Sequence, residues 1–180
     1  MNCTAIQTSP NAEGLTASLA QATLKGVQES GGTTELIHLN QYDIKSCIAC
    51  DTGWGQCQEN GSCILEDDFE TLRQKLVTAD ALVFATPVYF GGLSESATRF
   101  LDRLRRCERS SGFTTFADKK IIGITSAGGS GRGAVCALYH LEDYLRRFGF
   151  EILDLVSVTR FSKEHKLPML TIAGQKLVTE

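Results

Sequence analysis

The sequence predicts an α/β fold, a doubly wound five-stranded parallel sheet with helices on both faces and the strand order 2-1-3-4-5. Two observations predict it. Strand-like and helix-like segments alternate five times along the 180 residues. The segment Ala81–Ala85 is an unbroken apolar run too short for a helix, which is typical of a strand buried on both faces of a parallel sheet. We expect a single domain over residues 1–180, with a Cys-rich inserted loop at residues 40–67.

The first half of the chain begins with a strand–helix–strand unit. Met1–Thr8 is mildly apolar, and Ser9-Pro10-Asn11 supplies turn chemistry after it. The helix that follows has apolar residues at helical spacing, and we expect Gly26 to let it approach the sheet closely. The remaining expected elements here are a strand at Thr33–Leu39, a helix from Phe69 to Val77 and the central strand at Ala81–Ala85.

Pro87 predicts the end of the central strand, because proline cannot donate a ladder hydrogen bond and holds the preceding residue extended. The second half then contains a helix over Leu93–Arg109, a strand over Lys119–Ser126, a helix over Val135–Phe148, a strand over Glu151–Thr159 and a short helix over Met169–Val178. On the first of these helices Arg99, Arg103 and Arg106 form a basic stripe, a pattern that most often faces solvent or a second subunit and only occasionally binds phosphate.

Composition excludes several classes of function. A net charge of −3 gives no general basic field for nucleic acid. The longest apolar run is far below the ~20 residues of a membrane span, and Met1–Pro10 does not resemble a signal peptide. We therefore expect a soluble cytoplasmic protein with no membrane partner. Seven cysteines are many for that compartment, so those that cluster are expected to be redox-active or metal-binding rather than joined in structural disulfides.

Three unusual loops are predicted to converge. In the order 2-1-3-4-5, the loops after strands 1, 3 and 4 meet at the carboxyl edge of the sheet beside the switch point. These are Ser9–Thr16, Thr86–Gly92 and Ser126–Gly133. We expect a ligand site there, with Val88, Tyr89 and Phe90 standing in the second loop.

The chemistry of the three loops indicates flavin mononucleotide. Hydroxyls and helix-start amides in the first loop suit a phosphate monoester, while the Walker lysine and the G-x-G-x-x-G fingerprint are absent. Tyr89 and Phe90 suit a planar ligand, although capping the core is an equally weighted alternative for them. The third loop has four glycines in six positions, which lets backbone amides approach the polar edge of a ring.

Several motifs resemble the flavodoxin-like NAD(P)H-dependent FMN reductases, in particular the branch that contains iron–sulfur flavoproteins. They are T-S-P-N-A-E-G-L-T, a C-x-x-C loop leading to E-D-D-F, A-D-A-L-V-F-A-T-P-V-Y-F, T-R-F-L-D-R and the late glycine-rich loop. The resemblance covers roughly residues 1 to 150 and implies FMN as cofactor, NAD(P)H as co-substrate and a homo-oligomer, dimer or tetramer. The FMN-binding residues it implies are Ser9, Asn11, Gly14, Leu15, Thr16, Pro87, Val88, Tyr89, Phe90, Ser126, Gly128, Gly129 and Gly131.

The chain departs from this pattern in its phosphate loop. Similar proteins usually carry Arg where Asn11 stands and Asn where Leu15 stands, and Glu13 adds a negative charge beside the expected phosphate. A charge-assisted phosphate contact is stronger than a neutral one, so FMN is expected to be held less tightly than in relatives unless an arginine arrives from elsewhere.

The inserted loop carries Cys47, Cys50, Cys57 and Cys63, separated by two, six and five residues. Similar cluster-binding proteins have a tighter run, so Asp51–Gln56 is an insertion into a [4Fe–4S] spacing. A cluster, a tetrahedral zinc ion or a redox disulfide such as Cys47–Cys50, and inert thiols remain open as alternatives. The other three cysteines, Cys3, Cys107 and Cys136, are expected to be small buried hydrophobes.

Three functions follow from these interpretations. The first is an FMN-dependent enzyme that takes hydride from NAD(P)H and reduces a quinone, flavin or similar small-molecule acceptor by a ping-pong mechanism, with the flavin rather than a side chain carrying the chemistry. The second is an electron carrier in which a cluster on the four loop cysteines exchanges electrons with FMN. The third is a thiol or metal sensor on a flavodoxin-like scaffold that no longer binds FMN.

Overall fold

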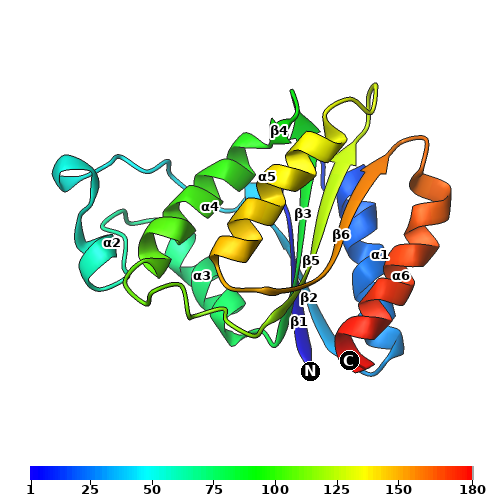
Figure 1. The fold of residues 1–180 in the computed structure, drawn as a ribbon, viewed down its shortest axis with the longest axis horizontal. Helices are drawn as coiled ribbons and strands as arrows, with labels where there is room; N and C mark the ends of the chain where they lie inside the picture. The colour runs from blue at the N-terminus through cyan, green and yellow to red at the C-terminus, as the bar shows by residue number, and fades with distance from the viewer. Residues whose placement is uncertain (180) are drawn as a thin grey trace.

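A computed structural model describes residues 1–179 and shows a parallel sheet between two layers of helices (Figure 1). The five parallel strands lie in the order β2-β1-β3-β5-β6, which confirms the predicted order 2-1-3-4-5. Apolar strands with few side chains facing water account for this arrangement, because all-parallel sheets need cover on both faces. The strands are β1 Asn2–Gln7, β2 Thr33–His38, β3 Ala81–Tyr89, β5 Lys120–Ala127 and β6 Glu151–Thr159.

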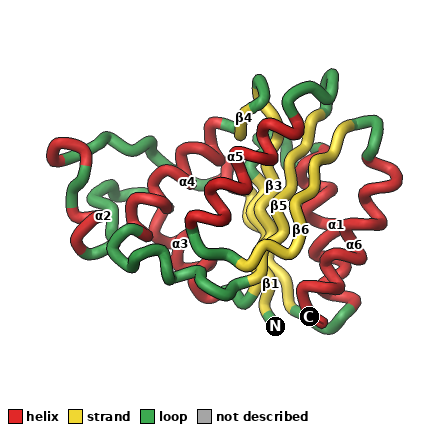
Figure 2. Tube along the Cα trace, in the orientation of Figure 1, coloured by secondary structure: helices red, strands yellow, loops and turns green. Residues whose placement is uncertain are grey.

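The helices divide between the two faces of the sheet, red on either side of the yellow strands in Figure 2. On one face lie α1 Leu15–Glu29 and α6 Lys163–Thr179, and on the other α3 Phe69–Thr78, α4 Glu95–Glu108 and α5 Ala134–Arg147. Each layer has its own buried cluster, because the sheet separates them. The short elements are η1 Leu39–Gln41, η2 Asp51–Gly53, α2 Gln56–Glu59 and β4 Gly92–Leu93.

The central strand does not end at Pro87, contrary to the sequence prediction. β3 continues to Tyr89 and pairs with the short antiparallel strand β4. Pairing of β3 with β1 stops at Ala85, whose carbonyl oxygen accepts the Thr8 N–H. Backbone groups two residues apart face the same neighbour, so Pro87 faces β1, and the N–H that it lacks is the one that would donate to the Thr8 carbonyl oxygen. That oxygen accepts hydrogen bonds from Asn40 Nδ2 and Ser96 Oγ instead. Proline therefore ends the pairing with β1, while pairing with β5 carries β3 onward through Pro87.

Helix α1 makes its closest backbone approach to α6, not to the sheet as predicted for Gly26. A Cβ added at Gly26 would lie 1.9 Å from the carbonyl oxygen of Thr171. In the opposite direction, a Cβ on Gly174 would lie 2.0 Å from the carbonyl oxygen of Thr23. The two glycines bring the helices together at a separation that no larger residue permits.

Helix α6 is longer than predicted, because it begins at Lys163 rather than at Met169. Pro168 lies inside it, in the second turn, where its missing N–H costs one intrahelical hydrogen bond. Burial of Leu170 and Leu177 against α1 and the sheet offsets that cost. Within residues 1–179, no helix has the length and apolar character that crossing a membrane requires.

Candidate functional site

The loops after β1, β3 and β5 meet at one end of the sheet, the upper end in Figure 1. Two hydrogen bonds between hydroxyl groups join them. Thr16 Oγ1 lies 2.7 Å from Ser126 Oγ, which links the first loop to the third. Thr8 Oγ1 lies 2.9 Å from Ser94 Oγ, which links the end of β1 to the start of α4. The predicted convergence of the three loops is therefore present, and buried polar contacts fix it.

The first loop ends at an uncapped helix N-terminus. Gly14 is the N-cap of α1, makes no side-chain capping bond, and is followed by a first turn without acidic residues. The loop folds on itself: Ser9 Oγ accepts the Asn11 N–H at 3.2 Å, and Asn11 Oδ1 accepts the Glu13 N–H at 3.0 Å. Residues 9–16 contain no lysine or arginine. An anion in this loop would meet backbone amides, hydroxyl groups and the positive end of the helix dipole, but no guanidinium group.

A second layer of polar residues supports this loop and was not predicted from the sequence. The carbonyl oxygen of Thr8 accepts hydrogen bonds from Asn40 Nδ2 and from Ser96 Oγ, both at 2.9 Å. Gln7 Nε2 lies 2.8 Å from His38 Nδ1, and Gln7 also bonds both backbone groups of Ser9. Single polar residues at strand ends give no recognisable sequence pattern, so only the fold reveals this support.

The second and third loops enclose a cavity of about 840 Å³. That volume lies within the range usual for small-molecule sites. Six of its lining residues were predicted to bind the flavin, while Ser9–Thr16, Pro87 and Ser126 lie outside its lining. The first loop is joined to the third by the hydrogen bond between Thr16 and Ser126, the residue before Ala127 of the lining. The predicted site residues that line the cavity are Val88, Tyr89, Phe90, Gly128, Gly129 and Gly131.

The two aromatic residues face solvent rather than the core. Tyr89 is 39% exposed and Phe90 is fully exposed, and neither belongs to a buried cluster. Phe90 and Gly91 both have positive φ, which is the backbone of a tight hairpin turn between β3 and β4. The alternative in which these side chains cap the core is therefore not what the structure shows.

The glycines of the third loop divide into two groups. A Cβ at Gly128 or Gly129 would meet no atom within 4 Å, so nothing in the protein requires glycine there. Gly133 is different, because its φ is +76° and an added Cβ would lie 2.5 Å from the Cα of Gly91. Gly133 closes the third loop against the hairpin, whereas Gly128 and Gly129 leave open space beside the cavity.

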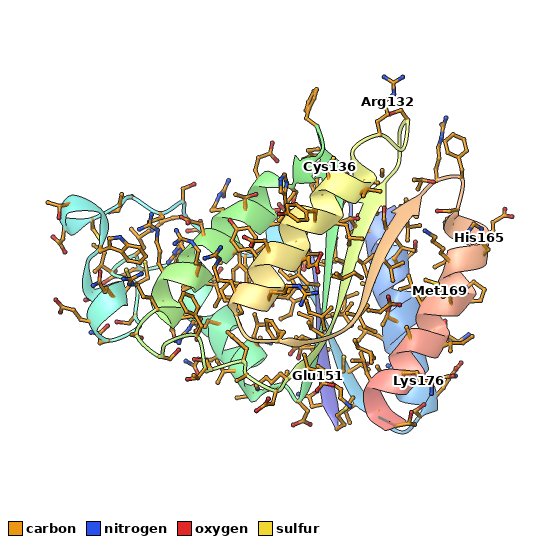
Figure 3. All side chains as sticks on the ribbon, in the orientation of Figure 1. Arg132, Cys136, Glu151, His165, Met169 and Lys176 are labelled. Carbon is orange, nitrogen blue, oxygen red and sulfur yellow. The ribbon has the colours of Figure 1, made fainter. Side chains whose placement is uncertain are left out.

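Seven lining residues of the cavity are absent from the predicted set, among them Glu95, Arg132 and Cys136. Figure 3 shows Arg132 at the tip of the loop after β5 and Cys136 just below it at the start of α5. The prediction that Cys136 is buried is wrong, since its thiol is exposed, whereas Cys3 and Cys107 are buried as expected. Helical periodicity placed Cys136 one position away from the buried face that Ala134, Ala137 and Leu141 form.

The arginine stripe of α4 holds the Cys-rich loop, a role that the sequence did not suggest. Arg99 is exposed as expected, whereas Arg106 is half-buried and Arg103 is buried. Arg99 Nη1 donates to the carbonyl oxygen of Ile44 at 3.0 Å, and Arg106 Nη1 donates to that of Gly53 at 2.6 Å. Arg103, 1% exposed, bonds both carboxylate oxygens of Asp67, which is fully buried. The insertion thus lies beside α4, on the left of Figure 1.

Trp54 anchors the six inserted residues on the same helix. Its ring lies 4.9 Å from the guanidinium carbons of both Arg106 and Arg109, and 5.7 Å from that of Arg105. Cation–π contacts of this kind contribute about 0.5–1 kcal/mol each at exposed sites. The insertion therefore has a defined position on α4.

All four cysteines of the loop line one small pocket, and a fifth, Cys107 of α4, lines it with them. Burial raises the pKa of the Cys107 thiol to about 12, with smaller contributions from neighbouring Cys63 and Cys57. A Cβ on Gly55 would lie 2.7 Å from Cys50 Sγ, so this glycine makes room for a thiol. Among residues 1–179, no group of three cysteine, histidine or acidic side chains is arranged to hold a metal ion.

One buried donor in this pocket has no partner. Arg103 uses its terminal nitrogens for Asp67 and the Lys45 carbonyl, but its Nε–H makes no hydrogen bond. An unpaired buried donor costs about 1–3 kcal/mol. Burial opposes the charge on Arg103, but the carboxylate of Asp67 and the neighbouring Cys63 outweigh that effect, so the pKa of Arg103 is raised.

Comparison with known proteins places the chain among flavodoxin-like proteins that share its sheet and helices. A quinone oxidoreductase described as NAD(P)H-dependent, from Methanothermobacter marburgensis, superposes with a TM-score of 0.71 at 22% identity, over 98% of this chain and 96% of that one. The protein RosB, solved with a bound 8-demethyl-8-formylriboflavin-5′-phosphate, gives a TM-score of 0.75 at 17% identity, over 99% of this chain and 79% of its own.

The sequence comparison identifies the family. A model of the NADPH-dependent FMN reductases matches residues 1–162, and the chain belongs to that family. An iron–sulfur flavoprotein of Methanocaldococcus jannaschii is 35% identical over 105 residues, which are 58% of this chain and 52% of the relative. The chain thus matches about half the length of its curated relatives, and the resemblance noted in the sequence analysis is confirmed.

Proposed function

We propose that this protein is an FMN-dependent oxidoreductase that passes reducing equivalents from NAD(P)H to a small-molecule acceptor such as a quinone or a free flavin. The observation that carries the proposal is the Thr16–Ser126 link between an uncapped helix N-terminus and the glycine-rich loop of a cavity that aromatic residues also line. A phosphate group and a planar ring with a polar edge are the two ends of FMN. Membership of the FMN reductase family supports the same cofactor.

The first loop is proposed to hold the phosphate. The N–H groups in the first turn of α1, after Gly14, point outward at the helix N-terminus, where the helix dipole favours an anion. Ser9 and Thr16 contribute hydroxyl groups, while Asn11 is the substitute for the arginine of similar proteins. Because Asn11 already bonds Glu13 through its side chain, we expect a neutral and comparatively weak phosphate site.

The second and third loops are proposed to hold the ring. Tyr89 and Phe90 offer flat apolar surface, and Gly128 and Gly129 leave their backbone amides unobstructed. When bound, FMN supplies hydride chemistry, so the protein needs to position it and control access rather than provide an acid or base. The cavity lies open to solvent beside these residues, which allows the nicotinamide and then the acceptor to occupy it in turn, as a ping-pong mechanism requires.

The protein is proposed to work in the cytoplasm and as a homo-oligomer. All seven cysteines are free, which fits the reducing cytoplasm. Val135 and Tyr139 on α5 and Phe90 in the hairpin are exposed hydrophobic residues at the same end of the molecule, which fits a homo-oligomer.

Steady-state NADPH and NADH oxidation tests this function. Purified protein, loaded with FMN and freed of excess cofactor, is expected to oxidise at least one of the two nucleotides when a soluble quinone is present. A riboflavin-treated sample is the control, because the phosphate site should retain FMN and release riboflavin. Protein that retains no FMN, or that holds FMN yet oxidises neither nucleotide, would refute the proposal.

The electron-carrier alternative gains no comparable support. It requires the thiol pocket to adjoin the flavin edge, but Cys107 lies 12 residues beyond Glu95 at the start of α4, or about 18 Å along the helix at 1.5 Å per residue. The pocket is therefore at the far end of the helix whose first turn supports the phosphate loop.

A further inference from the structure

The side-chain amide of Gln7 is held in one orientation by the first residue of the phosphate loop. Gln7 ends β1 and is fully buried. Its Oε1 accepts the Ser9 N–H at 2.8 Å, and its Nε2 donates to the Ser9 carbonyl oxygen at 3.1 Å. Turning the amide over would set oxygen against oxygen and N–H against N–H. The backbone of Ser9 therefore fixes which end of the Gln7 amide carries the hydrogen atoms.

The second N–H of that amide points to His38. Gln7 and His38 are partners in the parallel ladder between β1 and β2, and Gln7 Nε2 lies 2.8 Å from His38 Nδ1. Because Gln7 Nε2 can only donate, His38 Nδ1 has to accept, and a ring nitrogen of histidine accepts only when it carries no proton. In this arrangement His38 is therefore a neutral imidazole with its proton on Nε2.

Protonation of His38 is incompatible with this chain of hydrogen bonds. A proton on Nδ1 would face the Gln7 N–H across 2.8 Å. Either the imidazole moves away and leaves a buried amide N–H unpaired, or the Gln7 amide turns over and gives up both bonds to Ser9. Histidine changes charge between about pH 5 and 8, and His38 is half-buried on the edge strand β2, where protons from solvent reach it.

The surroundings of His38 do not compensate a positive charge. Within residues 1–179, no carboxylate forms a hydrogen bond or an ion pair with it. The N-terminus of α1 lies at the same edge of the sheet, and its dipole is positive there. The ionisable side chains on the segments around β2 are Glu13 in the first loop, Tyr42 after η1, Glu95 at the start of α4, the Lys25–Glu29 pair of α1 and the Lys75–Glu35 pair on the other face of β2.

We propose that His38 is a positioning residue for the phosphate loop. As a neutral imidazole it holds the Gln7 amide, and Gln7 holds both backbone groups of Ser9. Protonation of His38 breaks this support, loosens the loop and lowers the affinity for FMN. The only covalent change is one proton taken from solvent. This inference rests on the proposed function, because Ser9 begins the loop assigned to the FMN phosphate.

The affinity of the FMN-free protein for FMN, measured at about pH 8 and about pH 5, tests the proposal. His38→Asn keeps an acceptor, Oδ1, near the position of Nδ1 and does not titrate in this range. The FMN phosphate and Glu13 titrate in both proteins, so the ratio of the two dissociation constants isolates His38. The ratio should be near one at about pH 8. Wild type should bind about 3- to 10-fold more weakly than the variant at about pH 5, because hydrogen bonds are lost.

Two further variants serve as controls. His165→Asn is the matched substitution at an exposed histidine of α6 (Figure 3), and its pH dependence should follow wild type. His38→Phe keeps a ring without an acceptor, so it should bind FMN more weakly than wild type already at about pH 8. Circular dichroism and melting of each FMN-free protein at both pH values separate loss of binding from loss of fold.

Nuclear magnetic resonance of wild-type FMN-free protein tests the same linkage without a cofactor or a variant. The Gln7 side-chain amide signal and the Ser9 backbone amide signal should shift together with the protonation of His38. Signals that stay fixed while His38 titrates would overturn the proposal.

Two results on FMN affinity would also overturn it. One is a His38→Asn protein with the same pH dependence as wild type. The other is tighter binding by wild type than by this variant at about pH 5, which a phosphate-binding cation at His38 would produce. Absence of FMN binding at about pH 8 refutes the proposed function instead, and the Gln7 and Ser9 signals then still decide whether His38 holds the loop.

Discussion

Replacing Gly128 with alanine separates a glycine kept for a ligand from a glycine kept for the fold. An added Cβ at this position meets no atom within 4 Å, and its φ is not in the left-handed region. The folded protein therefore accommodates alanine without strain. Because alanine also restricts the unfolded chain, stability should stay the same or rise by about 0.4–1 kcal/mol, or by roughly 1–4 °C in melting temperature for a chain of this size.

The same methyl group should interfere with FMN. If the ring edge approaches the Gly128 backbone, the methyl occupies space that the cofactor needs, and overpacking of that kind costs about 1–3 kcal/mol. That range corresponds to a dissociation constant about 5- to 150-fold larger. Flavin fluorescence quenching measures the dissociation constant, and calorimetry of the FMN-free protein measures the melting temperature.

The matched variant is Gly133→Ala. Its φ of +76° and its 2.5 Å approach to the Gly91 Cα predict a less stable FMN-free protein, because neither backbone segment gives way easily. Gly128→Ala protein that binds FMN with unchanged affinity would refute the placement of the ring against the third loop. Gly128→Ala protein that melts well below wild type would refute the argument that the fold does not need this glycine.

Three further variants test other parts of the structure. Tyr89→Ala should weaken FMN binding about tenfold to a hundredfold, because ring stacking contributes about 1–3 kcal/mol. The melting temperature of the FMN-free protein should change little, because this side chain lies outside the core. Unchanged FMN affinity would contradict this prediction. Gly26→Ala should lower the melting temperature by about 4–8 °C and leave FMN affinity unchanged. The added Cβ would lie 1.9 Å from the Thr171 carbonyl oxygen, and overpacking of this kind costs about 2 kcal/mol. A variant that melts at the wild-type temperature would contradict this prediction. Burial tends to raise the pKa of Asp67, but hydrogen bonds, first among them that from Arg103, outweigh burial and lower the pKa. The stability that ionised Asp67 contributes is therefore complete above a pH of about 4 and is lost as the pH falls through the lowered pKa. Asp67→Asn should therefore cost about 3–5 kcal/mol at neutral pH and flatten the acid limb of urea-unfolding curves measured across pH; an unchanged acid limb contradicts it.

The fold was predictable because its signals are local and repeated. Runs such as Ala81–Ala85 identify buried strands, and their alternation with helical segments fixes the topology through right-handed crossovers. The convergence of the three loops then follows from the strand order alone. For the same reason the site residues could be proposed from the sequence.

What could not be predicted depends on contacts between distant segments. Continuation of β3 through Pro87 depends on its pairing with β5, and Gly26 approaches α6 rather than the sheet because of a glycine 148 residues later. The role of Arg103 depends on Asp67 and on an insertion that ordinary spacing rules do not place. Periodicity also failed by one position at Cys136, which turned an exposed cavity residue into an expected core residue.

Single-turnover reduction of the bound flavin tests the central claim most directly. FMN-loaded protein is mixed anaerobically with NADPH or NADH, and the visible absorbance of the flavin is followed. The account predicts that one or both nucleotides bleach the absorbance, and that a quinone added afterwards restores it in a separate phase. Flavin that stays fully coloured with both nucleotides, on protein shown to hold it stoichiometrically, would contradict the account.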